Sequence, residues 1–543
     1  MERGKLHSEK TAQVSKICTI IVFFIVLFLP LLGIFFKGNN IQLVNEKRQL
    51  SKRPEFRLKS LRKFSKEFEQ YFNDRIPFRD LLIFTNSFLK MRYLGTSPVP
   101  KVIIGKEGWL FYRGDNVANV AEGYFLAAPL RKEQLALLQV YLEAKRDWLA
   151  ERGIKYLFVI APDKQSIYPE FLPDSYYRAA SHIDQLKEYL KTNSDIDIVD
   201  LRQPLLRAKR DYPVFYKSDT HWNEYGAFIS CIEIIKSLTN YFPTLQIPQL
   251  SDYPIRYETV NGRDLADMLA MGNFISEAVP RPIRLTSQMH YQDEPSHGIP
   301  ITAKIDPQVP FATERMGGEL PRGVMFGDSF SVSIGPFLSE SFSRIAYVHI
   351  HLSSLALQQK VIEQETPNVV IDEIVERSMS AFLTIPVPQD MLDALYRKRF
   401  NESTGILTLI NSESGYQGVL PLNEVNIFSE KIDQARVLLL RAIGGDPSIQ
   451  LPDFPFPKGK HVIMRVDIAS SADTTLQIFF QTTKSRAYTE AKSIRRSINK
   501  GRNILYIPLS EADLYGNIRL DPGDVPGDYY LYSVEIRAVR KIS

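Results

Sequence analysis

A series of short apolar runs constrains the fold of this 543-residue chain more than any other feature. The runs are Lys155–Ala161, Ile196–Asp200, Gly323–Phe326, Arg344–Ile350 and Asn368–Glu373. Helical apolar spacing lies between or before them, at Leu135–Leu149, Asp184–Leu190 and Tyr225–Leu238. Buried parallel strands have this continuous apolar character, and each needs a crossover that is usually a helix. The pattern predicts an α/β domain with a parallel sheet flanked by helices, to which we assign residues 98–400.

Two segments of this region do not follow the strand–helix pattern. Residues 102–112 contain two short apolar runs around Gly105 and Gly108, which predict a hairpin that opens the domain. Residues 251–320 are rich in proline, glycine and methionine and lack clean periodicity, and we expect a long insertion or lid there.

The N-terminal part of the chain predicts a membrane anchor. Ile17–Phe36 is a run of twenty residues without a charge, long enough to cross roughly 30 Å of hydrocarbon. Residues 1–16 carry Arg3, Lys5, Lys10 and Lys16. By the positive-inside rule they form a cytoplasmic tail, so that everything after the run lies outside the cytoplasm. A cleaved signal peptide is the alternative, but the run is long for one and no A-x-A-like site follows it. Residues 37–97 form a basic, helix-rich approach segment.

The pattern changes after residue 400. Apolar residues alternate with others at Val462–Ile468 and Tyr530–Ala538, and glycine and proline turns separate such runs. This alternation is typical of a β-sandwich, to which we assign residues 401–543. The predicted sandwich contains a basic cluster with aromatic neighbours, from which the candidates for glycan binding are Arg486, Arg495, Arg496 and Tyr488. Such groups suit an acidic sugar chain, by stacking and charge pairing; the alternative is a solvated basic face.

Charge and cysteine content add little. The net charge of +5 permits an anionic partner without requiring one, and a position outside the cytoplasm argues against nucleic acid. Cys18 lies in the apolar run, and Cys231 lies on an apolar helical pattern that makes it a small core residue. No CxxC metal site exists, and we expect no cofactor.

Two short motifs contain the parts of an acyl-transfer triad. Asp219 and His221 occur in SDTHWN, and Ser329 occurs in FGDSF. A serine hydroxyl is a weak nucleophile that needs an adjacent base, and the base needs an orienting acid. In extended backbone the side chains of residues i and i+2 point the same way, which would direct Asp219 and His221 into one cleft. Gly327 permits a tight turn after a strand, which would place Ser329 at the carboxyl edge of the sheet, where ligands bind in open α/β folds.

Each motif also has a simpler explanation. Ser329 could cap a helix in a turn, and His221 could be a structural histidine. A metal site is a further alternative, because His349 and His351 share one face of a predicted strand and could join the Asp219–His221 pair. We expect no metal and interpret the two histidines as part of an ordinary sheet element.

The motifs together resemble the SGNH/GDSL hydrolase superfamily, with the usual order of the serine and Asp/His motifs reversed. That reversal, with the N-terminal anchor, is similar to the alginate O-acetyltransferase group of AlgJ, AlgX and DHHW-type proteins. Further stretches resemble the sequences of that group; they are Phe72–Arg79, Val102–Tyr112, Ala161–Lys164, Tyr168–Glu170, Tyr216–Ala227 and Val375–Arg377. The resemblance covers about residues 45–380.

The resemblance implies that Ser329 is the nucleophile, His221 the general base and Asp219 the orienting acid. The superfamily's separate glycine and asparagine oxyanion blocks have no obvious match in this chain. The candidates for oxyanion or substrate contacts are therefore Lys164, Gly327 and Trp222. Lys164 is equally well interpreted as an exposed loop lysine. Glu376 and Arg377 are expected to form a structural ion pair with each other.

The resemblance also implies a function: transfer of acetyl groups to a secreted exopolysaccharide by a single-pass protein of the bacterial inner membrane, with its catalytic domain periplasmic. A multi-spanning membrane acyltransferase would deliver the acetyl group. A polysaccharide acetylesterase with the same triad is one alternative. A non-catalytic glycan-binding scaffold of a secretion complex is another.

Overall fold

The computed structural model describes most of the chain after residue 60. The described residues are 16–25, 28, 51–52, 54, 61–73, 79–113, 129–174, 181–284, 289–290, 310–315, 319–350, 354–413, 415–432, 435–453, 456–457, 461–509 and 513–539. Of the predicted membrane anchor, only residues 17–25 and 28 are among them, and these are helical. Within the described ranges, no helix combines the length and apolar character that a membrane crossing requires.

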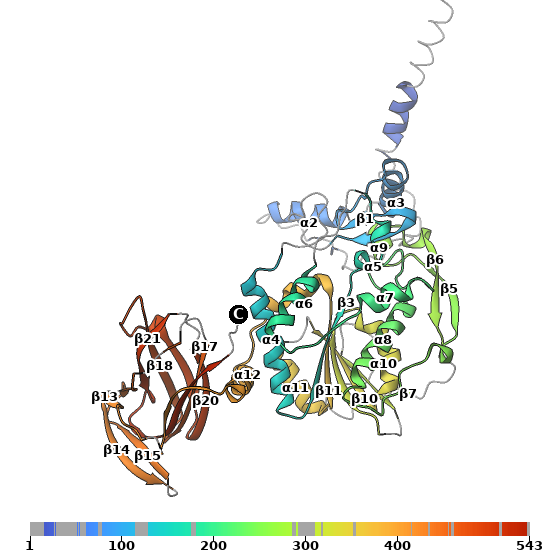
Figure 1. Ribbon diagram of the computed structural model, residues 1–543. Helices are drawn as coiled ribbons and strands as arrows, with labels where there is room; N and C mark the ends of the chain where they lie inside the picture. The colour runs from blue at the N-terminus through green and yellow to red at the C-terminus, as the bar shows by residue number, and fades with distance from the viewer. Residues whose placement is uncertain are drawn as a thin grey trace, which may run out of the picture.

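A seven-stranded sheet forms the centre of the α/β part (Figure 1). Its strands, in spatial order, are β4 (Ile198–Asp200), β3 (Lys155–Ala161), β11 (Val369–Val375), β9 (Arg322–Gly327), β10 (Arg344–His349), β8 (Phe311–Arg315) and β7 (Met289–His290). The first five are mutually parallel, and β8 and β7 add an antiparallel edge. All five strands predicted from the apolar runs are confirmed.

Helices cover both faces of this sheet, and each face has its own apolar core. One face packs against α7 (Arg202–Ala208), α8 (Glu224–Leu238) and α10 (Ser331–Leu338). The other packs against α4 (Lys132–Ala150), α6 (His182–Asn193), α11 (Leu355–Glu365) and α12 (Gln389–Glu402). Successive residues of β3 alternate between the two cores, Val159 in the first and Ile160 in the second, as the pleat requires. Cys231 is fully buried on α8, so the prediction that it is a small core residue is confirmed.

The carboxyl ends of β3, β11 and β9 lie side by side, because β11 pairs with both of the others. Each strand leads directly into a short element there: β3 into α5 (Lys164–Ile167), β11 into a 3₁₀ segment (Glu376–Thr384) and β9 into the turn before α10. The chain thus brings three sequence-distant turns together at one sheet edge, which is where the predicted nucleophile lies.

The 251–320 segment is more regular than the sequence indicated. It forms the antiparallel hairpin of β5 (Ile255–Asn261) and β6 (Ser276–Pro282), with α9 (Asp264–Met268) between the two strands. Its later part contributes β7 and β8 to the main sheet. The sequence lacks clean periodicity here because the hairpin is largely exposed and so lacks the apolar alternation that marks a half-buried strand. The role of this segment as an insertion or lid stays a prediction.

Two smaller groups of elements precede the main sheet. The predicted hairpin at residues 102–112 is confirmed as β1 (Val102–Ile104) paired with β2 (Leu110–Tyr112). Its residues pack on α9 in a small separate core. Before it lie the helices α2 (Leu61–Asn73) and α3 (Arg79–Leu89), which agree with the prediction of a helix-rich segment.

The C-terminal part consists of two sheets that share one apolar core. One sheet has the order β14 (Val425–Ile432), β15 (Ala435–Ala442), β22 (Gly527–Val539), β17 (His461–Ser470) and β20 (Gly501–Leu509), with β12 (Gly405–Ile410) also paired to β22. The other has the order β13 (Leu420–Asn423), β16 (Ser448–Gln450), β21 (Leu514–Asp521), β18 (Thr474–Thr482) and β19 (Ser493–Ile498). Helix α12 connects the two parts, and Phe400 and Tyr396 on it pack against Tyr506 of β20.

Candidate active site

Ser329 and His221 meet at the sheet edge although 108 residues separate them. The Nε2 atom of His221 lies 2.8 Å from the hydroxyl of Ser329, and its Nδ1 atom lies 2.7 Å from Oδ1 of Asp219. With the proton on Nδ1, the imidazole donates to Asp219 and accepts from Ser329. This is the hydrogen-bond order in which a histidine removes the serine proton as the nucleophile attacks. The structure therefore brings the three predicted triad residues together in the geometry that their predicted roles require.

Asp219 and His221 face one cleft for a different reason from the one expected. They lie in a bend between two residues of an isolated bridge, Phe215 and Trp222, and not in a strand. Oδ1 of Asp219 also accepts the backbone N–H of His221 at 3.1 Å. The aspartate side chain thus folds the loop back on itself, as Asx turns do. The prediction of extended backbone is wrong, since this local bond replaces strand alternation as the device that aligns the pair.

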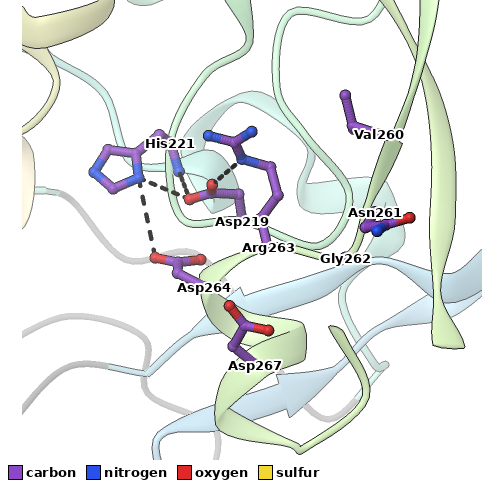
Figure 2. A pocket seen from close by; sticks show the side chains of 8 residues that line it. All are labelled: Asp219, His221, Val260, Asn261, Gly262, Arg263, Asp264 and Asp267. Atoms are coloured by element: carbon purple, nitrogen blue, oxygen red, sulfur yellow. Dashed lines mark hydrogen bonds and ion pairs between the residues drawn. The ribbon is translucent and has the colours of Figure 1, made fainter. Parts of the chain in front are cut away.

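Two residues from the start of α9 complete the acid side of the site (Figure 2). Arg263 donates its Nε proton to Oδ2 of Asp219 at 2.7 Å. Asp264 accepts both the backbone N–H and the hydroxyl of Thr220, at 2.8 and 2.7 Å. Burial by itself would raise the pKa of Asp219, but the bonds from His221 and Arg263 hold that pKa far below its ordinary value. Burial and the charge of Asp219 raise the pKa of Asp264 to about 6.

Lys164 holds the triad loop from below. Its ammonium donates to three backbone carbonyl oxygens of that loop, those of Tyr216 and Lys217 at 3.0 Å and that of Asp219 at 2.5 Å. The side chain is 2 % exposed, so the interpretation as an exposed loop lysine is wrong. An ammonium has three protons, and the three carbonyls use all of them, which leaves none for an oxyanion. Burial lowers the pKa of Lys164 to about 7 against the opposing effect of the carboxylates around it.

The hairpin beyond α9 holds the other side of the same loop. Glu277 of β6 accepts the backbone N–H groups of Lys217 and Ser218, and also the Ser218 hydroxyl. The carbonyl of Ser218 in turn accepts from the first turn of α9. The triad loop is therefore fixed by Lys164 on one side and by the 255–282 segment on the other.

The turn that carries Ser329 is built on buried acids. Both oxygens of Asp328 accept backbone N–H groups, from Phe330 at 2.9 Å and from Val375 at 2.7 Å. The backbone N–H of Asp328 donates to Glu373, which is fully buried on β11. Burial, and secondarily the charge of Asp328, raises the pKa of Glu373 well above its ordinary value. A side chain at Gly327 would collide with Ser331 in this turn, which explains the glycine.

The backbone N–H of Ser329 is available to an oxyanion. Among the residues that the structure describes, this group donates to no protein acceptor. Trp222 does not reach the cleft: its indole is fully buried and packs edge-on against Phe330, at a ring distance of 4.9 Å. Gly327 is also buried, in the last position of β9. Trp222 and Gly327 are therefore buried supports of the turn that carries Ser329, and neither contacts the cleft.

The expected ion pair between Glu376 and Arg377 is wrong. Arg377 pairs with Asp163, and Glu376 accepts from the Ser166 hydroxyl at 2.7 Å and from the Asp163 backbone at 3.2 Å. Both residues begin the 3₁₀ segment, and on a helical turn the side chains of residues i and i+1 do not face each other. The guanidinium of Arg377 lies 5.3 Å from the centre of the Phe330 ring, which places a positive charge next to the nucleophile turn.

A cavity of about 500 Å³ opens beside His221, and the start of α9 forms its other wall. Asp219, His221 and Asp264 each offer one atom that could coordinate a metal ion, and these atoms lie within 4.8 Å of one another. N–H and O–H donors of the protein already occupy these carboxylates. A cation would have to displace them. His349 lies half-buried on β10, as expected of a sheet residue, and His351 lies outside the described residues.

The four predicted glycan-binding residues do not form one patch. Arg486 lies against the ring of Tyr515, and Arg496 interacts electrostatically with Asp393 of α12. Arg495 and Tyr488 line a cavity of about 470 Å³ on the β16–β21–β18–β19 face of the sandwich. The predicted basic cluster is thus divided among three environments.

Comparison with known proteins agrees with the sequence resemblance. Residues 102–298 match the family model described as the SGNH hydrolase-like domain of the acetyltransferase AlgX. This match includes Asp219 and His221 and ends before Ser329. The predicted resemblance to the alginate O-acetyltransferase group is confirmed.

Two curated relatives carry the name probable alginate O-acetylase AlgJ. The protein from Pseudomonas syringae pv. tomato is 29% identical over 227 residues, which are 41% of this chain and 55% of that protein. The protein from Azotobacter vinelandii is 26% identical over 258 residues, 46% of this chain and 62% of that protein. The chain therefore spans little more than half the length of the curated relatives it matches. The solved O-acetyltransferase domain of Pseudomonas putida AlgJ superposes with a TM-score of 0.37 at 18% identity, covering 55% of this chain and 99% of that one.

Replacing Lys164 with methionine tests its role as support of the triad loop. The variant leaves three buried carbonyls unpaired and lets His221 move away from Ser329. A displacement of about 1 Å at a reacting group costs on the order of a hundredfold in rate. We expect kcat for a small acetyl ester to fall by roughly that factor, with KM changed much less. The control is Lys217→Met in the same loop, where the ammonium donates to the Glu107 carbonyl at a long 3.4 Å. Equal turnover in the two variants would contradict the role.

Replacing Glu373 with glutamine tests the buried proton of the nucleophile turn. Because the folded-state pKa is raised above 4.5, the contribution of Glu373 to stability is complete below that pH and is lost as pH rises toward the folded-state pKa. Glutamine mimics the protonated acid and does not titrate. As pH rises above about 5, the free energy of unfolding of Glu373→Gln should therefore decrease less than that of the wild type. Denaturant titrations at several pH values measure this, with the exposed Glu402→Gln as control. Identical pH slopes in wild type and variant would show that Glu373 is not protonated.

Proposed function

We propose that this protein is an O-acetyltransferase that moves an acetyl group to a hydroxyl of a polysaccharide through an acetyl-enzyme on Ser329. The observation that carries the proposal is the unbroken hydrogen-bond chain from Arg263 through Asp219 and His221 to the Ser329 hydroxyl. The relatives' names support acetyl transfer, and the match over residues 102–298 supports the same chemistry.

In the first half-reaction, the Ser329 oxygen attacks the carbonyl carbon of the acetyl donor. Its proton passes to Nε2 of His221, and Asp219 stabilises the imidazolium that forms. The Ser329 backbone N–H donates to the oxyanion that forms on the acyl carbonyl. When the tetrahedral intermediate collapses, the donor's leaving group takes the proton from His221 and departs, and the acetyl ester remains on Ser329.

In the second half-reaction, a sugar hydroxyl attacks the acetyl-enzyme. His221 removes the hydroxyl proton as the new ester bond forms, and returns it to the Ser329 oxygen as the acyl–enzyme bond breaks. Water can take the place of the sugar, in which case the product is acetate and the enzyme is an esterase. We propose that the cavity beside His221 binds the acceptor, because a sugar hydroxyl positioned within roughly 3–3.5 Å of the acyl carbon outcompetes water.

The setting of this activity is also a proposal. We infer that the catalytic part lies outside the cytoplasm, held by the predicted single-pass anchor at residues 17–36. A multi-spanning membrane acyltransferase is the proposed source of the acetyl group. The division into a catalytic domain at 98–400 and a sandwich at 401–543 is supported by their separate apolar cores.

Product analysis distinguishes transfer from hydrolysis. The full chain is incubated with 4-nitrophenyl acetate and mixed oligosaccharides, and the sugars are examined by mass spectrometry. We expect acetylated oligosaccharides from the wild type and from the control Ser343→Ala, and none from Ser329→Ala, because only Ser329 can carry the acetyl group. Turnover by Ser329→Ala would contradict the triad. Sugars that never gain acetyl groups, together with deacetylation of a pre-acetylated polymer, would replace the transferase with an esterase.

A further inference from the structure

The cavity on the sandwich, lined by Tyr488 and Arg495, combines features that proteins use to bind a sugar. Tyr488 is half-buried at its wall, and its ring meets Phe479 edge-on at 6.4 Å between centroids. Arg519 lies over the Phe479 ring at 4.9 Å and joins the base of the cavity. An aromatic wall beside fixed polar groups is how proteins hold a sugar ring, by stacking on its apolar face and hydrogen bonding to its edge.

The charged groups of this cavity are mainly carboxylates. Asp446, Glu490, Asp521 and Asp524 line it, against the two guanidinium groups of Arg495 and Arg519. Both guanidiniums are already paired. Arg519 donates to Asp521 at 2.7 Å through two nitrogens and to Asp446 at 2.8 Å, and Arg495 donates to Glu490 at 3.0 Å. The cavity therefore carries two more negative than positive charges.

The cavity beside His221 has the same imbalance. Asp264 and Asp267 line it in addition to the Asp219–Arg263 pair, whose charges cancel. An acidic sugar that entered would meet carboxylates in both places, and like charges brought together in an interface weaken binding. Sugar hydroxyls, by contrast, donate well to carboxylates. The two cavities lie on different parts of the chain, so the excess of negative charge in one is independent of the excess in the other.

We propose that the acceptor is a polysaccharide without acidic groups, a neutral or amine-bearing glycan, and that the cavity around Tyr488 holds it for the acetyl-enzyme. This inference rests on the proposed function and specifies its substrate class. It also reverses the expectation that the basic residues of the sandwich select an acidic chain, because those residues are divided, and Arg495, which lines the cavity, is paired with Glu490.

Calorimetric titration of the full chain tests the proposal without any turnover. The probes are hexasaccharides of matched length: a neutral one of xylose or glucose, one of glucosamine and one of galacturonic acid. We expect the neutral or the glucosamine probe to bind at least roughly tenfold more tightly than the galacturonate probe at low salt, with the gap narrowing as salt screens the repulsion. The relative affinity of the first two probes separates a neutral from an amine-bearing acceptor.

Charge variants make the test specific to the cavity. Asp446→Asn with Glu490→Gln removes two negative charges and the ion pairs of Arg495 with Glu490 and of Arg519 with Asp446, while Arg519 keeps its pair with Asp521, so it should strengthen galacturonate binding about tenfold. The control, Asp197→Asn with Glu402→Gln, makes the same charge change at exposed positions outside both cavities and should leave binding unchanged. Tyr488→Ala should weaken binding of every probe.

Three outcomes overturn the inference. Galacturonate that binds wild type as tightly as the other probes contradicts the substrate class. A cavity variant that behaves like the control contradicts the charge argument, and no binding of any probe contradicts the glycan site. None of these results touches acetyl transfer to Ser329, which the small-ester experiments measure separately, so failure of the inference and failure of the proposed function are distinguishable.

Discussion

The buried ammonium of Lys164 is the contact on which the rest of the site depends. It lies at the end of β3 and bonds three carbonyls of the loop that carries the acid and the base. Among the described residues, this loop has the isolated bridge of Phe215 with Trp222 and one backbone hydrogen bond from β2, in which the Leu110 N–H donates to the Lys217 carbonyl. Because one cation satisfies three backbone acceptors at once, the loop position is tied to the central sheet. His221 is thereby placed 2.8 Å from a serine on another strand.

The nucleophile side uses the opposite device, two buried acidic side chains. Asp328 satisfies both of its oxygens on backbone N–H groups, and Glu373 accepts from the backbone of Asp328 itself. This arrangement fixes the turn after β9 while leaving the next N–H, that of Ser329, available. The buried ammonium of Lys164 fixes the loop of Asp219 and His221, and the buried acids Asp328 and Glu373 fix the turn of Ser329. The fold brings these two rigid segments together, and acyl transfer requires such preorganisation.

The sequence predicted the sheet and the triad but not the residues that support them. Continuous apolar runs identify β3, β9 and β11, and the motifs around His221 and Ser329 contain recognisable chemistry. Arg263 and Asp264 had no such signal, because their function depends on an exposed hairpin that returns to the triad loop. The motif around Lys164 is recognisable, but sequence alone does not distinguish a buried ammonium from an exposed one. The sequence also does not predict the net charge of the cavity around Tyr488, because that charge depends on which side chains line the cavity and which of them are paired.

The central claim, that the hydrogen-bonded chain ending at Ser329 makes this serine the acetyl carrier, has one direct test. The protein is mixed with 4-nitrophenyl acetate, quenched in acid within the first turnover, digested and mapped by mass spectrometry. The account predicts one acetyl group on the peptide containing Ser329, absent from Ser329→Ala and reduced in His221→Ala. Acetate formation without any acetyl group on that peptide, or acetylation equal in wild type and Ser329→Ala, would contradict it.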